Sequence, residues 1–267
     1  MSSFNILSVA GTDPSGGAGI QADLKAFSAL GGYGMSVVTA LVAQTTTGVA
    51  AVHRVPPEFI TRQLDVLLQD VRADAVKIGM LGDTDVIAAV VGALDAYRPP
   101  HVVLDPVMVA KSGDRLLAAD AIEAVRTELL PRADLITPNL PEAAELLGEP
   151  EAADTAAMEA QARRLLELGA RRVLIKGGHQ DTAQSTDLLV EPGAQARAFS
   201  APRVPTGNTH GTGCTLSSAI AALLPQRDGC AAAVREAKDY LTGALRRADE
   251  LDVGAGKGPV HHFHAWW

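Results

Sequence analysis

The sequence predicts an α/β fold with a central, mostly parallel sheet flanked by helices on both faces. Three observations predict it: short apolar runs alternate with amphipathic stretches, these runs are continuously apolar, and no linker, charge block or fixed-period repeat interrupts them. Continuous apolar strands are typical of parallel sheets that are buried on both faces. We therefore expect residues 1–267 to form one domain, with ligands at the carboxyl ends of its strands.

Short apolar runs bounded by polar or glycine-containing segments predict the strands. In chain order they are Asn5–Ala10, Ser36–Val42, Ala75–Met80, Val102–Leu104, Leu135–Thr137, Val173–Lys176 and Asp187–Glu191. The amphipathic stretches between them predict helices. These are Gly19–Leu30, Glu58–Val71, Thr84–Ala96, Ala119–Leu129, Pro141–Leu147, Thr155–Leu168, Gly213–Leu224 and Cys230–Ala248. The stretch Gly32–Arg54 is predicted as a small edge element or a lid.

Composition and charge narrow the classes of protein. A formal net charge of −8 argues against nucleic acid or an anionic membrane as the main partner. No apolar run approaches the length of a membrane span, and the amino-terminal residues lack the basic flank of a signal peptide. Two cysteines are too few for a disulfide scaffold. We therefore expect a reduced, cytoplasmic protein.

The run Asn208–Thr215 carries the strongest functional signal. Gly211 and Gly213 bracket Thr212 and lead into an apolar helix. A tight glycine turn at a helix N-terminus gathers N–H groups into an anion site, most often for phosphate. Cys214 lies at its opening, where the same field would favour a thiolate that serves as base or nucleophile. The alternative is a glycine-rich turn before a buried helix, with Cys214 in the core.

A second glycine-rich loop, residues 11–19, joins the first strand to the first helix. Glycines allow a ligand to approach the backbone closely. The loop lacks the spacing of a dinucleotide site and the ending of a P-loop, so a flexible loop with a helix cap is the alternative. Asp23 is expected in the first turn of the helix, where it would complement the dipole.

Polar residues follow three further strands. Asp105, with Asn139 and Glu142, offers oxygen ligands suited to a magnesium–phosphate site. Helix capping around Pro141 would also explain Asn139 and Glu142. Lys176 ends an apolar run and needs an anionic partner.

Three other features have open interpretations. The amide of Gln44 offers a donor and an acceptor, which suits paired nitrogens of a heteroaromatic ring, but it would also serve as a polar turn residue. His179 and His210 are expected to be polar pocket or surface residues. The histidine-rich tail after Gly258 is predicted to pack against the body, with a metal tract as the alternative.

The motifs together resemble one enzyme family over essentially the whole chain. They are Ala10–Lys25, Lys77–Leu81, Asp105–Met108, Thr137–Ala143, Lys176–His179, His210–Cys214 and the tail Gly258–His264. In this order they resemble the hydroxymethylpyrimidine/phosphomethylpyrimidine kinases of thiamine biosynthesis. The resemblance implies a three-layer ribokinase-like fold. It also implies ATP-dependent phosphorylation of 4-amino-5-hydroxymethyl-2-methylpyrimidine to the monophosphate and then to the diphosphate.

The resemblance implies roles for matching positions. Gln44 would hydrogen-bond the aminopyrimidine, and the ring would be surrounded by Gly11, Ala18, Asp23, Met80 and Val107. Magnesium and phosphate would be organised by Asp105, Asn139 and Glu142. Lys176 would neutralise phosphate charge, and Gly177 and Thr209 would lie against ATP. Gly211, Thr212 and Gly213 would form the anion hole, with Cys214 as the base.

Other readings stay open at this point. Many ribokinase-like sugar kinases carry aspartate where this chain has Cys214, whereas pyrimidine kinases and some pyridoxal kinases carry cysteine. A pyridoxal (vitamin B6) kinase is therefore an alternative within enzymes, and a noncatalytic pyrimidine-binding sensor is one outside them. The family resemblance also implies a homodimer. Lys111 and Ser112 are candidates for holding the extra charge of the monophosphate substrate.

Overall fold

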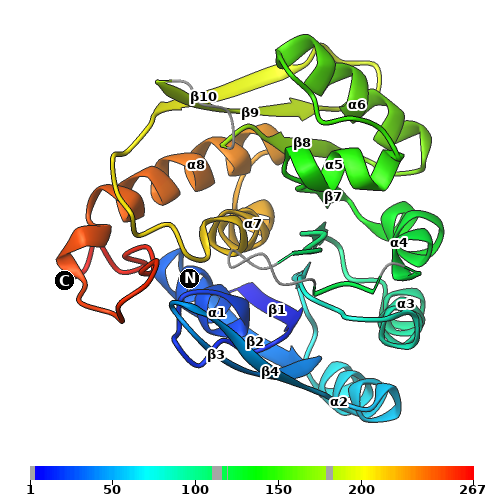
Figure 1. The fold of residues 1–267 in the computed structure, drawn as a ribbon. Coiled ribbons are helices and arrows are strands. Elements are labelled where there is room, and N and C mark those ends of the chain that lie inside the picture. The colour runs from blue at the N-terminus through cyan, green and yellow to red at the C-terminus, as the bar shows by residue number, and fades with distance from the viewer. Residues whose placement is uncertain (1–3, 110–115, 119, 179–182) are drawn as a thin grey trace.

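An eight-stranded sheet forms the centre of the molecule (Figure 1). The computed structural model describes residues 4–109, 116–118, 120–178 and 183–267. The strands are β1 (Phe4–Ala10), β2 (Gly32–Val38), β3 (Ala40–Thr45), β4 (Gly48–Arg54), β5 (Ala75–Ile78), β6 (Val102–Leu104), β7 (Leu135–Ile136), β8 (Val173–Lys176), β9 (Gln184–Val190) and β10 (Arg197–Pro202). The order in the main sheet is β10-β9-β8-β7-β6-β5-β1-β2.

The prediction of a mostly parallel sheet is confirmed. β2, β1, β5, β6, β7 and β8 pair in parallel, and only the pairings β8–β9 and β9–β10 at one side of the sheet are antiparallel. The chain goes from β1 outward to β2 and later returns to β5 on the other side of β1. Such a reversal of strand order is where α/β proteins bind ligands, at the carboxyl ends of the strands.

Helices cover both faces of the sheet (Figure 1). They are α1 (Gly19–Ala29), α2 (Pro57–Asp70), α3 (Thr84–Tyr97), α4 (Ala121–Ala124), α5 (Leu140–Leu147), α6 (Thr155–Glu167), α7 (Thr212–Leu223) and α8 (Cys230–Arg246). One apolar core packs α2 to α6 against the sheet, and the other packs α1, α7 and α8 against the opposite face. The apolar faces that predicted these helices are thus the faces that are buried.

The strand predicted at Ser36–Val42 is wrong as a single element. β2 ends at Val38 and β3 begins at Ala40, where the chain leaves the main sheet. Thr39 makes the corner, because its N–H donates to Ala10 and its hydroxyl to Met80. β3 and β4 form a separate antiparallel ribbon, which confirms the small element expected within Gly32–Arg54. Apolar residues run through this corner without a turn signal, so the sequence hides it.

Two further differences have local causes. The helix predicted at Ala119–Leu129 is α4 followed by a wider π-helical segment, Val125–Leu129, and a short 3-10 turn; Ala119 lies outside the described residues. β10 was not predicted, because it is an edge strand with alternating exposure rather than a continuous apolar run. Among the described helices, none has the length and apolarity needed to cross a membrane.

Candidate functional site

The two glycine-rich loops meet at the point where the strand order reverses. We call residues 11–19 the first loop and residues 210–213 the anion loop. Gly211 is the N-cap of α7 and has a φ of +74°, and a Cβ there would collide with the carbonyl oxygen of Gly17 in the first loop. Only glycine allows both this conformation and this close approach. The structure therefore brings the predicted anion site against the loop after β1.

Asp13 organises the first loop and was not singled out from the sequence. Its carboxylate accepts hydrogen bonds from the N–H groups of Ser15 and Ala18 (2.9 and 2.7 Å) and contacts His210 Nε2 at 2.7 Å. Burial disfavours its charge, but hydrogen bonds from His210, Ser15 and Gln44 outweigh that effect and hold its pKa well below the usual range. The signal in the sequence was Asp-Pro-Ser, a typical Asx-turn composition.

The predicted cation and carboxylates gather beside the anion loop. Lys176 Nζ lies 2.8 Å from Asp105 Oδ1 and 3.7 Å from Glu142 Oε2. A Cβ placed on Gly213 would lie 3.3 Å from the same Nζ, so the helix backbone passes directly over this ammonium group. Ser217 of α7 donates to the other oxygen of Asp105 at 3.2 Å. We call Lys176, Asp105 and Glu142 the open cluster.

The two carboxyl groups of the open cluster have pKa values shifted in opposite directions. Burial disfavours the charge of Asp105, yet Lys176 and Lys77 keep its pKa below the ordinary value. Burial raises the pKa of Glu142 to about 7, and the charge of Asp105 adds to this effect against the attraction of Lys176. The Lys176 ammonium therefore faces two carboxyl groups, and Glu142 is protonated more easily than Asp105.

Asn139 and Glu142 form a reciprocal capping box at the start of α5. The side chain of Asn139 accepts from Glu142 N, and Glu142 Oε2 accepts from Asn139 N, both at 2.8 Å. The capping explanation is thus confirmed, while a metal role stays a prediction. No group of three or more His, Cys, Asp or Glu residues within the described chain could hold a metal alone. The donors suit magnesium, which usually takes one or two carboxylates together with substrate phosphates and water.

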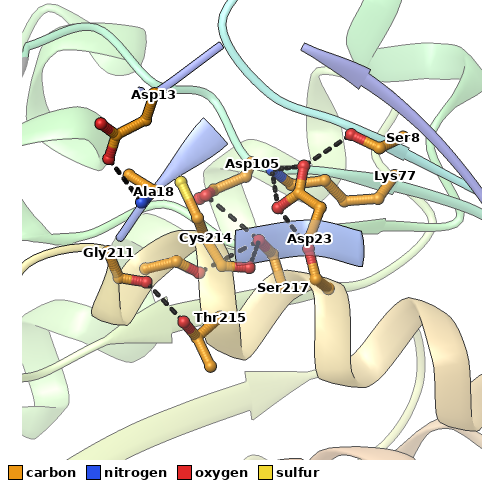
Figure 2. Close-up of polar contacts among 12 residues, drawn as sticks. Ser8, Asp13, Ala18, Asp23, Lys77, Asp105, Gly211, Cys214, Thr215 and Ser217 are labelled. Atoms are coloured by element: carbon orange, nitrogen blue, oxygen red, sulfur yellow. Dashed lines mark hydrogen bonds and ion pairs between the residues drawn. The ribbon is translucent and has the colours of Figure 1, made fainter. Parts of the chain in front are cut away.

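Asp23 lies elsewhere than expected. It is in the second turn of α1, is 0% exposed, and accepts from Ser8 (2.6 Å), Ser218 (2.6 Å) and Lys77 (3.0 Å), as Figure 2 shows in part. Its oxygens are occupied by protein donors, so the expected place against the pyrimidine ring and the expected dipole role are both corrected. Lys77 is equally buried; burial opposes its charge, but Asp23 raises its pKa above the usual range. We call Asp23, Lys77, Ser8 and Ser218 the closed cluster.

Cys214 lies beside Asp105 of the open cluster and also feels the charges of Lys77 and Asp23 in the closed cluster (Figure 2). It is half-buried in the first turn of α7, and its sulfur is near the N–H of Gly19. Burial raises its pKa to about 11; Lys77 favours the thiolate, but Asp105 opposes it. The expectation of a lowered pKa is wrong in this environment, because burial outweighs the effects of Lys77 and of the N–H of Gly19.

Several residues expected around the ring lie together. A Cβ at Gly11 would lie 3.2 Å from the sulfur of Met80 and close to Val42 of the ribbon. Gln44 of β3 lies close enough to Asp13 to lower the pKa of that carboxyl, and Asp13 also accepts from the N–H of Ala18. Val107, half-buried, follows Asp105 at the next strand end.

The two residues expected to lie against ATP follow β8 and precede the anion loop. Gly177 follows Lys176 and donates to Asp187 of β9 at 3.1 Å, and a Cβ there would collide with the oxygen of Thr186. Thr209, half-buried, precedes His210. His179, Lys111 and Ser112 lie outside the described residues.

The packing of the histidine-rich tail is confirmed. His261 and His262 are 2% and 4% exposed, and His262 Nε2 lies 3.0 Å from the hydroxyl of Thr215 on α7. His264 packs against Tyr240 of α8. The two terminal tryptophans stay about two-thirds exposed, so the histidines rather than the tryptophans anchor the tail.

A helix N-terminus lies over a lysine and two carboxylates beside the carboxyl ends of β6, β7 and β8, an arrangement typical of an α/β phosphoryl-transfer enzyme. The sequence profile of the family described as "Phosphomethylpyrimidine kinase" matches residues 13–261. The chain belongs to this family and is an ATP-dependent phosphotransferase.

Known proteins extend this similarity over the full length. The "Hydroxymethylpyrimidine/phosphomethylpyrimidine kinase" of Salmonella typhimurium is 58% identical over 100% of both chains. A crystal structure of phosphomethylpyrimidine kinase from Clostridium difficile matches with 41% identity and a TM-score of 0.80, covering 91% of this chain and 99% of that one. An ADP complex of Bacillus subtilis pyridoxal kinase matches at 34% identity and a TM-score of 0.91, over 99% of both chains. The ribokinase-like fold is thereby confirmed.

Proposed function

We propose that this enzyme transfers phosphate from ATP to the hydroxymethyl group of 4-amino-5-hydroxymethyl-2-methylpyrimidine, and then to the resulting monophosphate, in thiamine biosynthesis. The observation that carries the proposal is the 58% identity, from end to end, with a hydroxymethylpyrimidine/phosphomethylpyrimidine kinase. The open cluster under the anion loop supports it, because phosphoryl transfer depends mainly on positioning and charge stabilisation.

The geometry supports the roles proposed for residues on the phosphate side. Backbone N–H groups of Gly211, Thr212 and Gly213 receive the charge that builds on the transferred group. Lys176, placed under Gly213, neutralises the phosphates. Asp105 and Glu142 would hold magnesium, with Asn139 orienting Glu142. Magnesium, when bound, offsets the negative charge of the phosphates. Gly177 and Thr209 flank the nucleotide.

On the acceptor side, Gln44 reads the aminopyrimidine, and Gly11, Ala18, Met80 and Val107 surround the ring. Asp23 does not contact the pyrimidine; it stabilises this region through its bonds to Lys77 and the serines of the closed cluster. Cys214 takes the hydroxyl proton late in transfer, and the base is the thiolate fraction. Because its pKa is about 11, this step predicts a rate that rises with pH.

The ribbon supports a homodimer as part of this proposal. Leu41 of β3 is 50% exposed, and its register partner His53 of β4 is exposed on the same face of the ribbon. This face of the ribbon would be covered by the same face of a second copy. The location in the cytoplasm remains a prediction from cysteine usage.

The alternatives are less well supported. Identity is 34% with the Bacillus pyridoxal kinase but 58% with the pyrimidine kinase, so pyridoxal is not the favoured substrate. A noncatalytic sensor would not need Lys176 and two carboxylates under an anion loop.

A product assay resolved by mass tests the function. Purified protein with magnesium and ATP is offered the hydroxymethylpyrimidine or, in parallel, pyridoxal. We expect the pyrimidine monophosphate first and the diphosphate later. Turnover of pyridoxal at a comparable rate would contradict the assigned substrate, and binding without product from either would favour the sensor.

A further inference from the structure

We infer that Asp13 and His210 form a positioning pair that fixes the anion loop against the pyrimidine side of the site. This inference rests on the proposed function and adds two residues to which no role in the reaction has been given above. The pair joins segments that are 197 residues apart in the chain, with Asp13 Oδ2 2.7 Å from His210 Nε2. Neither side chain is placed against substrate.

The carboxylate of Asp13 is built to hold this contact. It is 1% exposed, and one oxygen accepts from the N–H and the hydroxyl of Ser15 (2.9 and 2.7 Å). The other oxygen accepts from the N–H groups of Gly17 (3.2 Å) and Ala18 (2.7 Å) as well as from His210. An ionised carboxylate only accepts, so His210 Nε2 carries the hydrogen of this bond.

His210 is fixed from its other side too. Its N–H donates to the carbonyl of Gly258 at 3.0 Å, and a Cβ at Gly17 would collide with its imidazole ring. The next residue is Gly211, the N-cap of α7. A movement of His210 therefore moves the first N–H groups of the anion loop.

Asp13 reaches the acceptor side by two routes. Ala18, whose N–H donates to Asp13, and Gln44, whose side chain lies close enough to lower the pKa of Asp13, both belong to the proposed pyrimidine pocket. One buried carboxylate thus sets the distance between the group that receives phosphate and the N–H groups that stabilise it. An error of about 1 Å in such an alignment costs on the order of 100-fold in rate.

His210→Phe keeps the ring shape and removes the donor. We expect kcat for pyrimidine phosphorylation to fall about 10- to 100-fold while the KM for magnesium–ATP changes little. We also expect more ADP than phosphorylated pyrimidine, because water then competes with a misaligned acceptor. His210→Gln, whose amide N–H replaces Nε2–H, should restore most of kcat and the one-to-one ratio of products.

Three controls make the test decisive. His101→Phe, on a half-buried histidine just before β6, should leave kcat and the product ratio unchanged. His210→Asn loses the bond without adding an apolar ring and should behave like His210→Phe, which covers the case in which the latter does not fold. Wild-type kcat and product ratio in a folded His210→Phe or His210→Asn would overturn the inference. A wild-type protein that makes no pyrimidine phosphate would instead overturn the proposed function.

Discussion

Two lysines near the carboxyl ends of β5 and β8 differ in the number of carboxylates around them. Lys77 is 0% exposed and meets Asp23, whose oxygens are also taken by Ser8 and Ser218. Lys176 is 12% exposed and meets two carboxylates beneath the backbone of Gly213. The closed cluster balances its charges and donors within the protein, whereas the open cluster carries an excess of carboxylate. This comparison indicates that the balance between a buried charge and its ionic and hydrogen-bonding partners, rather than burial alone, distinguishes a structural cluster from a candidate functional one.

The largest effect is expected in the closed cluster. Asp23→Ala leaves the Lys77 ammonium buried without its partner, so the free energy of unfolding should fall by about 3–5 kcal/mol. Denaturant unfolding measures this change. The exposed Asp239→Ala on α8 should change stability by less than about 0.5 kcal/mol. Equal losses in the two variants would show that the closed cluster is not a scaffold.

A double variant sharpens the same point. Asp23→Asn with Lys77→Met removes both charges and keeps an acceptor for one serine and a donor for the hydroxyl oxygen of the other. We expect it to be more stable than Asp23→Ala, because no unpaired charge remains. A double variant no more stable than the single one would mean that shape, not charge balance, governs this region.

Lys176→Met should lower activity strongly and stability weakly, whereas Asp23→Ala mainly lowers stability. We expect kcat/KM to fall about 100- to 1,000-fold, because a cation is lost where charge develops. The loss of stability should be smaller than for Asp23→Ala, since Glu142, with a pKa of about 7, takes up a proton when its cation is removed. Steady-state kinetics and unfolding of the same sample measure both. Full activity in the folded variant would remove Lys176 from the site.

Cys214 interacts with charged groups of both clusters, and its substitution tests whether it is the base of the reaction. Below its pKa of about 11 the thiolate fraction rises tenfold per pH unit, so wild-type kcat should rise by up to about tenfold per unit above pH 7. Cys214→Ser should lower kcat and flatten this slope. Cys230→Ser, in a buried cysteine at the start of α8, is the control and should keep it. A slope that survives in Cys214→Ser would assign the proton to another group.

The sequence predicted the open cluster better than the closed one for physical reasons. Asp105 and Lys176 stand at the ends of apolar runs, and the carboxyl ends of parallel strands meet at one edge. Lys77 lies within a strand and its partner lies 54 residues away, so spacing could not pair them. The pKa of Cys214 depends on burial by segments distant in the chain, and the Asp13–His210 contact spans 197 residues. Residues at strand ends can thus be predicted from local sequence motifs. The number of charged partners around a residue is known only from the tertiary structure.

The smallest effect on stability is expected for His262, a buried group that is neutral, in contrast to the charged lysines. Burial, with nearby Lys25 and His261, lowers its pKa to about 3, whereas an unfolded imidazole titrates near 6.5. Between these values the unfolded chain binds the extra proton. The stability contributed by neutral His262 is therefore present above about pH 6.5 and is lost as pH falls, by up to about 1.4 kcal/mol per unit. The free energy of unfolding of wild type relative to His262→Gln should thus be higher at pH 8 than at pH 5, and an equal difference at both would show that His262 takes up its proton without unfolding.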